Sequence, residues 1–185
     1  TALKLSLGEK SLPELKQDLQ TSKTVRTLQK DALYTTNEIE AIEREIVSKC
    51  RSYYQTIPNQ IKDDIWHKGM PPASLKRLTR DQHNALKFVM SGSTDRVIGI
   101  QGDAGTGKTT MLALAAKGYV RLGYDVITLG PTARAADELA QRGLPNAQTL
   151  DRFLLSKNEE STKPKLIIVD EASMLVSRKF KMILD

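Results

Sequence analysis

The chain has 185 residues, a formal net charge of +6 and 39% hydrophobic residues, which is enough for one medium domain with a buried core or one domain with a helical appendage. Its single cysteine, Cys50, and two histidines exclude an internal disulfide and a zinc cluster, which fits a reducing compartment, so we expect a cytoplasmic protein. No apolar stretch approaches the ~20 residues of a membrane span, and the mild, evenly spread positive charge permits nucleic-acid binding without requiring it.

Residues 1–75 have the pattern of a small helical N-terminal subdomain. Leucines at helical spacing predict a short helix around residues 12–19. Thr36 is the expected N-cap of a second helix that runs to about Tyr54, with isoleucines along one stripe and charged residues on the others. The glycine and two prolines within residues 68–74 cannot lie inside a regular element, so the domain junction is predicted there.

From residue 76 onward the pattern becomes α/β. Thr79 is expected to cap the first helix of this part, and Gly123 to close the second. Strands that alternate with helices predict right-handed crossovers and a parallel sheet covered on both faces. We expect helices near 79–91, 108–122, 133–141 and 150–156, and strands near 96–101, 125–129 and 165–169.

A glycine-rich loop lies between the first of these strands and the helix after it. Residues 102–109 contain the full G-x-x-x-x-G-K-[ST] pattern, which is typical of a phosphate-binding loop when it joins a buried strand to a helix. Its backbone N–H groups and the helix N-terminus form an anion site. Lys108 is expected to reach the β- and γ-phosphates and Thr109 to bind Mg²⁺. The alternative is a glycine-rich turn without a ligand.

The second chemical signal is an apolar strand that ends in two carboxylates, Asp170 and Glu171. At this distance after the loop, Asp170 is expected to hold Mg²⁺ opposite Thr109, and Glu171 to polarise the attacking water. Because ligands of parallel sheets bind at the carboxyl ends of the strands, the loop, residues 130–132 and this pair are predicted to meet at one rim. The sequence therefore predicts an ATP and Mg²⁺ site.

The two motifs together resemble motifs I and II of superfamily 1 DNA helicases of the RecD-like branch. The stretch 78–82 resembles the upstream L-T-x-x-Q motif, whose glutamine contacts adenine in that family. Residues 130–136 and 147–153 resemble two motifs that touch single-stranded DNA, although Asp151 stands where the family usually has histidine. The resemblance implies a first RecA-like P-loop NTPase lobe, with Lys108, Asp170 and Glu171 as catalytic residues and Thr109 and Asp170 as metal ligands. It implies that nucleotide is bound by Gln82, Gly102, Gly105, Thr106, Gly107, Lys108, Thr109 and Thr110. It also implies that DNA is bound by Pro131, Thr132, Arg134 and Thr149.

Within that branch the chain resembles conjugative relaxase-helicases of the TraI/TrwC (MobF) type, through residues 95–105, 129–135 and, less specifically, 34–38. The resemblance implies a 5′–3′ ATP-dependent helicase in plasmid DNA transfer. Its partners would be single-stranded DNA, a second helicase lobe and a nicking domain of the same polypeptide, and other conjugation proteins. The His cluster of a nicking domain is absent, so no nicking activity is assigned to these residues.

The lobe, residues 76–185, is expected to stop shortly after motif II, without motif III, a second lobe or its phosphate-stabilising arginine. We therefore expect the piece alone to bind nucleotide weakly and not to unwind DNA. Three alternatives stay open: a RecD-type recombination subunit, a vestigial lobe that serves as a DNA-binding or protein-docking module, and a DNA-independent ATPase or kinase.

Overall fold

The computed structural model describes residues 17, 25–29, 33–53, 70, 75–76, 78–92, 95–156 and 162–185. The predicted helix at 12–19 and the predicted junction at 68–74 lie outside these residues, apart from Gln17 and Met70. The chain divides into two compact units, Thr1–Lys49 with Val176–Asp185, and Cys50–Leu175. The junction predicted between residues 75 and 76 differs from this division and stays a prediction about domain organisation.

The first unit contains an antiparallel hairpin of β1 (Val25–Gln29) and β2 (Leu33–Thr36), followed directly by helix α3 (Asn37–Ser52). Thr36 Oγ1 accepts a hydrogen bond from Ile39 N at 3.2 Å, which confirms the predicted N-cap. Ile46 is the buried residue of the predicted apolar stripe. The hairpin was not predicted, because two short strands carry little periodicity and depend on each other for their hydrogen bonds.

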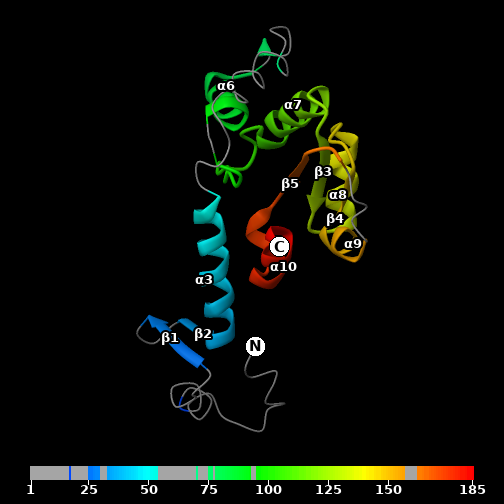
Figure 1. Ribbon diagram of the computed structural model, residues 1–185. Helices are drawn as coiled ribbons and strands as arrows, with labels where there is room; N and C mark the ends of the chain where they lie inside the picture. The colour runs from blue at the N-terminus through cyan, green and yellow to red at the C-terminus, as the bar shows by residue number, and fades with distance from the viewer. Residues whose placement is uncertain are drawn as a thin grey trace. The chain divides into compact units, whose positions relative to one another are not determined.

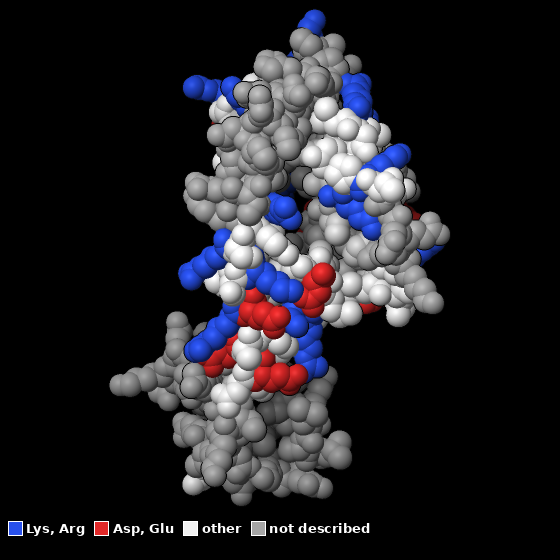
Figure 2. All heavy atoms as spheres, viewed as in Figure 1, with Lys and Arg blue, Asp and Glu red and all other residues white. Residues whose placement is uncertain are grey.

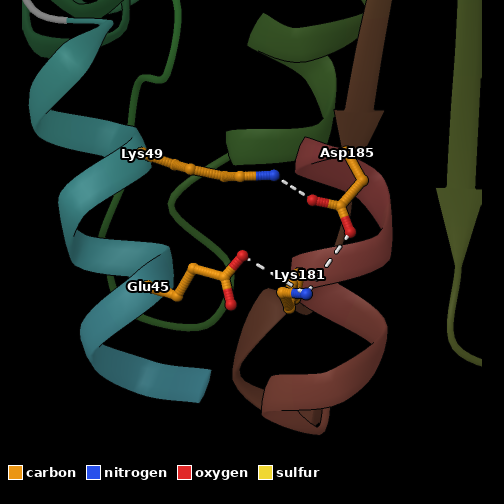
Figure 3. Close-up of polar contacts among 4 residues, drawn as sticks. All are labelled: Glu45, Lys49, Lys181 and Asp185. Carbon is orange, nitrogen blue, oxygen red and sulfur yellow. Dashed lines mark hydrogen bonds and ion pairs between the residues drawn. The ribbon is translucent and has the colours of Figure 1, made fainter. Parts of the chain in front are cut away.

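A second helix, α10 (Ser177–Leu184), belongs to the same unit and is joined to α3 by ion pairs. The pairs follow one another in the same direction along both helices, so α3 and α10 run parallel (Figure 3). On the face drawn in Figure 2, acidic side chains gather over α3 and α10, with lysines and arginines among them. Exposed pairs contribute only about 0–1 kcal/mol each, so they orient the helices more than they stabilise them. The pairs are Glu38 with Arg178, Glu45 with Lys181, and Lys49 with Asp185, and Lys181 also approaches Asp185.

The hydrogen bond from Lys49, helped by the charge of Lys181, lowers the pKa of the Asp185 carboxyl. A carboxyl whose pKa is depressed on folding contributes stability above its unfolded pKa, and that stability is lost as the pH falls through the folded value. This contact between α3 and α10 therefore weakens in acid.

The second unit is built on a parallel sheet in the order β4-β3-β5, with β3 (Asp125–Gly130) between β4 (Ala147–Thr149) and β5 (Lys165–Val169) (Figure 1). β3 is buried from Val126 to Gly130, as expected for a central strand covered on both faces. Helices α7 (Lys108–Arg121), α8 (Ala133–Gln141) and α9 (Leu150–Leu155) all contact it. These features confirm the predicted α/β class with a central parallel sheet.

One prediction about strands was wrong, and one strand was missed. Residues 96–101, expected as the first strand, lie outside the strands of the described sheet, and β4 was not predicted at all. A strand is defined by its hydrogen bonds to a neighbour, and an apolar run does not reveal whether a neighbour is present. Three residues, as in β4, are too few to show alternation.

Helix α6 (Arg80–Lys87) begins at its predicted N-cap, Thr79, and continues as a π-helical turn, Phe88–Gly92. The predicted apolar face is confirmed, because Leu86 and Met90 are fully buried while Ala85 and Val89 pack against the core at half-burial. α6 packs against α7, and buried side chains of these two helices belong to the same hydrophobic core.

The buried phenol of Tyr119 on α7 makes the stability of this unit sensitive to alkali. Its ring lies 5.0 Å from the ring of Tyr124, and its hydroxyl donates to Val89 O at 3.3 Å. Burial, and to a smaller extent Tyr124, raises the pKa of Tyr119 to about 12. Because the neutral phenol is the form that folding favours, its contribution is complete below the unfolded pKa of about 10 and is lost as the pH rises toward 12.

We therefore compare the free energy of unfolding of the wild type with that of Tyr119→Phe at two pH values. Between pH ~9 and ~11 the wild type is expected to lose about 1 kcal/mol relative to the variant, because only the wild type has the buried phenol. Urea titrations of both proteins at the two pH values measure this difference, and the other tyrosines and lysines cancel between them. A gap between the two proteins that does not change with pH would contradict the assignment.

Candidate functional site

The loop that precedes α7 has the conformation that its glycines allow. Gly105 and Gly107 have φ values of 78° and 79°, in the left-handed region that residues with a Cβ rarely adopt. Residues 101–106 are exposed, so the loop backbone faces solvent. The sequence G-x-x-x-x-G-K-[ST] therefore forms an open turn that leads directly into α7.

The N-terminus of α7 differs from those of α6, α8 and α9, the other described α-helices that begin in this unit. A threonine hydroxyl caps each of α6, α8 and α9, whereas the N-cap of α7 is Gly107, which has no side chain. The N–H groups of Lys108, Thr109 and Thr110 have no intrahelical acceptor, since the first such bond runs from Met111 N to Gly107 O. These N–H groups and the positive end of the helix dipole can bind an anion such as a phosphate.

Lys108 bends back over this loop. Its Nζ donates to Gly102 O and, at 2.7 Å, to Asp103 O. The ammonium group is therefore held by two backbone carbonyls of its own loop, which a phosphate oxygen could replace. This location is compatible with the predicted contact between Lys108 and a polyphosphate.

The carboxylate pair follows β5. Asp170 N donates to Leu129 O at 3.0 Å, which extends the parallel ladder by one residue, and Asp170 Oδ1 accepts from Glu171 N at 3.1 Å. Glu171 is exposed and has φ 51°, which is uncommon for a residue with a side chain. Strained residues of this kind gather at functional sites, because the surrounding structure must hold them in place.

The carboxyl edge of the sheet brings together the ends of three strands. The register places Gly130 beside Thr149, and Leu129 beside Val169. Thr149 is therefore the last residue of its strand, and Thr132 and Asp170 come just after the ends of the neighbouring strands. In the described part of the chain, the hydrogen bonds of Lys108 go to its own loop and not to Asp170 or Glu171. The predicted meeting of the loop and the carboxylates across one triphosphate therefore stays a prediction.

The residues predicted to bind DNA lie at the same edge. Thr132 and Thr149 cap α8 and α9, each accepting a backbone N–H at 3.1 Å. Arg134 is 90% exposed, and its Nε donates to Glu138 Oε1 at 3.1 Å, while Pro131 is half-buried. Surface pairs of this kind are weak, so the Arg134 guanidinium can exchange Glu138 for a phosphate.

Gln82, predicted to contact adenine, lies against the phosphate-binding loop. Its Nε2 donates to Thr106 O at 2.8 Å, and a Cβ added at Gly107 would overlap the same nitrogen. Sequence reasoning did not foresee this contact, although the L-T-x-x-Q pattern marked the residue.

The second unit combines a parallel sheet with a glycine-rich loop that follows residue 101 and leads into the uncapped N-terminus of α7. These features define a RecA-like lobe of the P-loop NTPase class. The family model described as AAA domain matches residues 77–185, which is more than half of the chain, so the chain belongs to the AAA domain family. Membership implies nucleotide binding, typically with Mg²⁺.

Two curated relatives are conjugation proteins. The chain is 26% identical over 157 residues to a probable conjugal transfer protein TraA of Sinorhizobium fredii, covering 83% of this chain and 14% of the relative. It is 28% identical over 128 residues to a conjugal transfer protein TraA of Rhizobium radiobacter, covering 64% of this chain and 12% of that protein. The chain therefore spans about one-seventh of the length of these relatives or less, and the similarity supports a helicase-like P-loop protein related to conjugation. Among the described helices, none is both long and apolar enough to cross a bilayer.

Proposed function

We propose that this chain is the first nucleotide-binding lobe of an ATP-dependent DNA helicase that acts in conjugal DNA transfer, of the TraI/TrwC relaxase-helicase type. The observation that carries the proposal is the open glycine loop on the uncapped N-terminus of α7, in a chain whose curated relatives are named as conjugal transfer proteins. Translocation and unwinding would belong to the whole protein, with a nicking domain and a second lobe as partners.

Each site residue has a role in this proposal. The phosphates would be bound by the turn that begins at Gly102 and by the backbone N–H groups of Gly105, Thr106, Gly107, Lys108, Thr109 and Thr110. The Lys108 ammonium would neutralise the β- and γ-phosphates. The Thr109 hydroxyl and the Asp170 carboxylate are hard oxygen donors of the kind that Mg²⁺ prefers. Mg²⁺ supplies charge neutralisation of the phosphates when bound. Glu171 would hold and orient the attacking water.

The DNA track would follow the carboxyl edge of the sheet. Arg134, with Pro131, Thr132 and Thr149 beside it, would contact phosphates of a single strand, a contact that depends on charge and backbone geometry and not on base sequence. The intact glycine loop favours an active lobe over a vestigial one, because an eroded loop would lack the left-handed glycines that direct these N–H groups and the lysine that follows them.

Titration of the chain with a fluorescent ATP analogue, with and without Mg²⁺, tests the proposal. We expect saturable binding that strengthens with Mg²⁺ and is reversed by excess ATP. A parallel titration with a labelled single-stranded oligonucleotide tests the DNA track, and we expect its affinity to fall steeply with salt and to depend little on sequence. A chain that binds no nucleotide under any of these conditions would contradict the proposal.

A further inference from the structure

The phosphate-binding loop carries a negative side chain as well as a positive one. Between residues 101 and 110 the charged residues are Asp103 and Lys108, so their charges cancel. The charged residues in the first turn of α6, which reaches the loop through Gln82, are Arg80 and Asp81 and are also of opposite sign. Because like charges repel, Asp103 opposes the binding of an anion at the N-terminus of α7, whereas Lys108 favours it.

The backbone of Asp103 lies beside the Lys108 ammonium. Lys108 Nζ donates to Asp103 O at 2.7 Å, and the Thr106 hydroxyl donates to the same oxygen at 2.9 Å. An aspartate carboxylate is so close to its own backbone that it lies within about 8 Å of this ammonium in any rotamer. The negative charge therefore belongs to the same small region as the lysine that is proposed to contact phosphate.

The Asp103 carboxylate is not neutralised by a neighbour. The residue is exposed, and among the described residues its carboxylate makes no hydrogen bond or ion pair, with Lys108 or with any other side chain. A polyphosphate that Lys108 contacts would come within roughly one Debye length, about 10 Å at 0.1 M salt, of this charge. The repulsion is therefore felt by the bound ligand.

The size of the repulsion depends on whether the ligand carries a metal ion. ATP has about four negative charges at neutral pH and about two when Mg²⁺ is bound. Coulomb energy is proportional to the charge of the ligand, so the carboxylate penalises the metal-free form about twice as strongly in free energy. A repulsive group of this kind creates selectivity by weakening the unwanted ligand more than the wanted one.

On the basis of the proposed function, we infer that Asp103 is a specificity-determining residue of the phosphate-binding loop, which discriminates against metal-free polyphosphates in favour of their Mg²⁺ complexes. It acts through its charge and does not ligate the metal. The attraction comes from the Lys108 ammonium and from the backbone N–H groups at the start of α7.

The test compares wild type and Asp103→Asn by calorimetric titration with ATP, once with Mg²⁺ and once with EDTA, at low ionic strength. The substitution removes the charge, keeps the size of the side chain and leaves the backbone carbonyl that binds Lys108 and Thr106. We expect the variant to bind metal-free ATP about tenfold more tightly than the wild type and the Mg²⁺ complex about threefold more tightly, the first factor being the square of the second.

Two further variants are the matched controls. Asp137→Asn removes an equal charge from an exposed residue of α8 and is expected to bind both forms of ATP as the wild type does. Asp103→Glu keeps the charge in the loop and is expected to keep the wild-type ratio of the two affinities. Together they separate the charge at this position from the net charge of the chain.

A second measurement uses the Mg²⁺ complex alone, at two salt concentrations. The tighter binding of Asp103→Asn should be present at ~50 mM salt and disappear at ~1 M, where the Debye length falls to about 3 Å. Where metal-free ATP binds too weakly to titrate, this measurement decides by itself, and tighter binding that persists in ~1 M salt overturns the inference.

Four other outcomes would overturn it. Asp103→Asn may not strengthen the two forms by the same factor, leave both unchanged or weaken the Mg²⁺ complex, as loss of a metal ligand would, and Asp137→Asn may not reproduce its effect. In each of these the wild type still binds nucleotide, so the proposed function survives. A wild type that binds ATP neither with Mg²⁺ nor with EDTA overturns both.

Discussion

Replacing Lys108 by alanine is expected to abolish ATP hydrolysis and DNA unwinding by the full-length protein, while any nicking activity stays intact. The Lys108 ammonium lies over the glycine loop, held by Gly102 O and Asp103 O. In the proposed function it exchanges these carbonyls for phosphate oxygens and neutralises the charge that develops during phosphoryl transfer. Loss of one such group typically lowers the rate by about 10²–10³-fold.

Lys117→Ala is the matched control, because Lys117 is an exposed lysine about two and a half turns further along the same helix and its replacement removes the same charge. ATPase assays with and without single-stranded DNA, a strand-displacement assay and a nicking assay on supercoiled DNA measure the three activities. Unwinding that persists in Lys108→Ala would refute the role of this residue. Equal loss in Lys117→Ala would show that the effect comes from net charge.

Leu129→Ala is expected to destabilise the second unit by about 2–5 kcal/mol, because it removes a fully buried side chain and leaves a cavity. Leu129 is 0% exposed and lies in β3, the strand between β4 and β5. Its backbone carbonyl accepts from Asp170 N, so the same residue joins the central strand to the carboxylate pair. Loss of packing here is expected to loosen that end of the sheet as well.

Leu155→Ala provides the control, since Leu155 is 85% exposed at the end of α9 and the same change there should stay within about 0.5 kcal/mol. Urea unfolding followed by far-ultraviolet circular dichroism measures both variants. A destabilisation of Leu129→Ala as small as that of Leu155→Ala would contradict the placement of β3 at the centre of the core.

Two of the alternatives that the sequence left open are now less favoured. The curated relatives are conjugal transfer proteins, which supports a conjugation protein over a RecD-type recombination subunit. The glycine loop keeps its left-handed turns and its open helix N-terminus, which supports an active lobe over a vestigial docking module. The oligonucleotide titration separates a helicase lobe from a DNA-independent ATPase.

The sequence by itself determined the features that are local in the chain. The predicted threonine caps at 36 and 79 and the end of α7 before Gly123 each depend on residues within about one turn, so their types predict the structure. The caps at 132 and 149 are equally local, although they were not predicted. The same holds for the glycine loop, whose left-handed positions only glycine tolerates well. Strands β3 and β5 were also foreseen, because long apolar runs are typical of buried parallel strands.

The tertiary structure alone decided what depends on residues far apart. β4 forms only because β3 lies beside it, and residues 96–101 stay outside the sheet although their composition suits a strand. Gln82 meets the loop 24 residues later, and α3 pairs with α10 across 136–140 residues. Local sequence cannot encode such contacts, because their energy comes from partners that only folding brings within hydrogen-bonding distance.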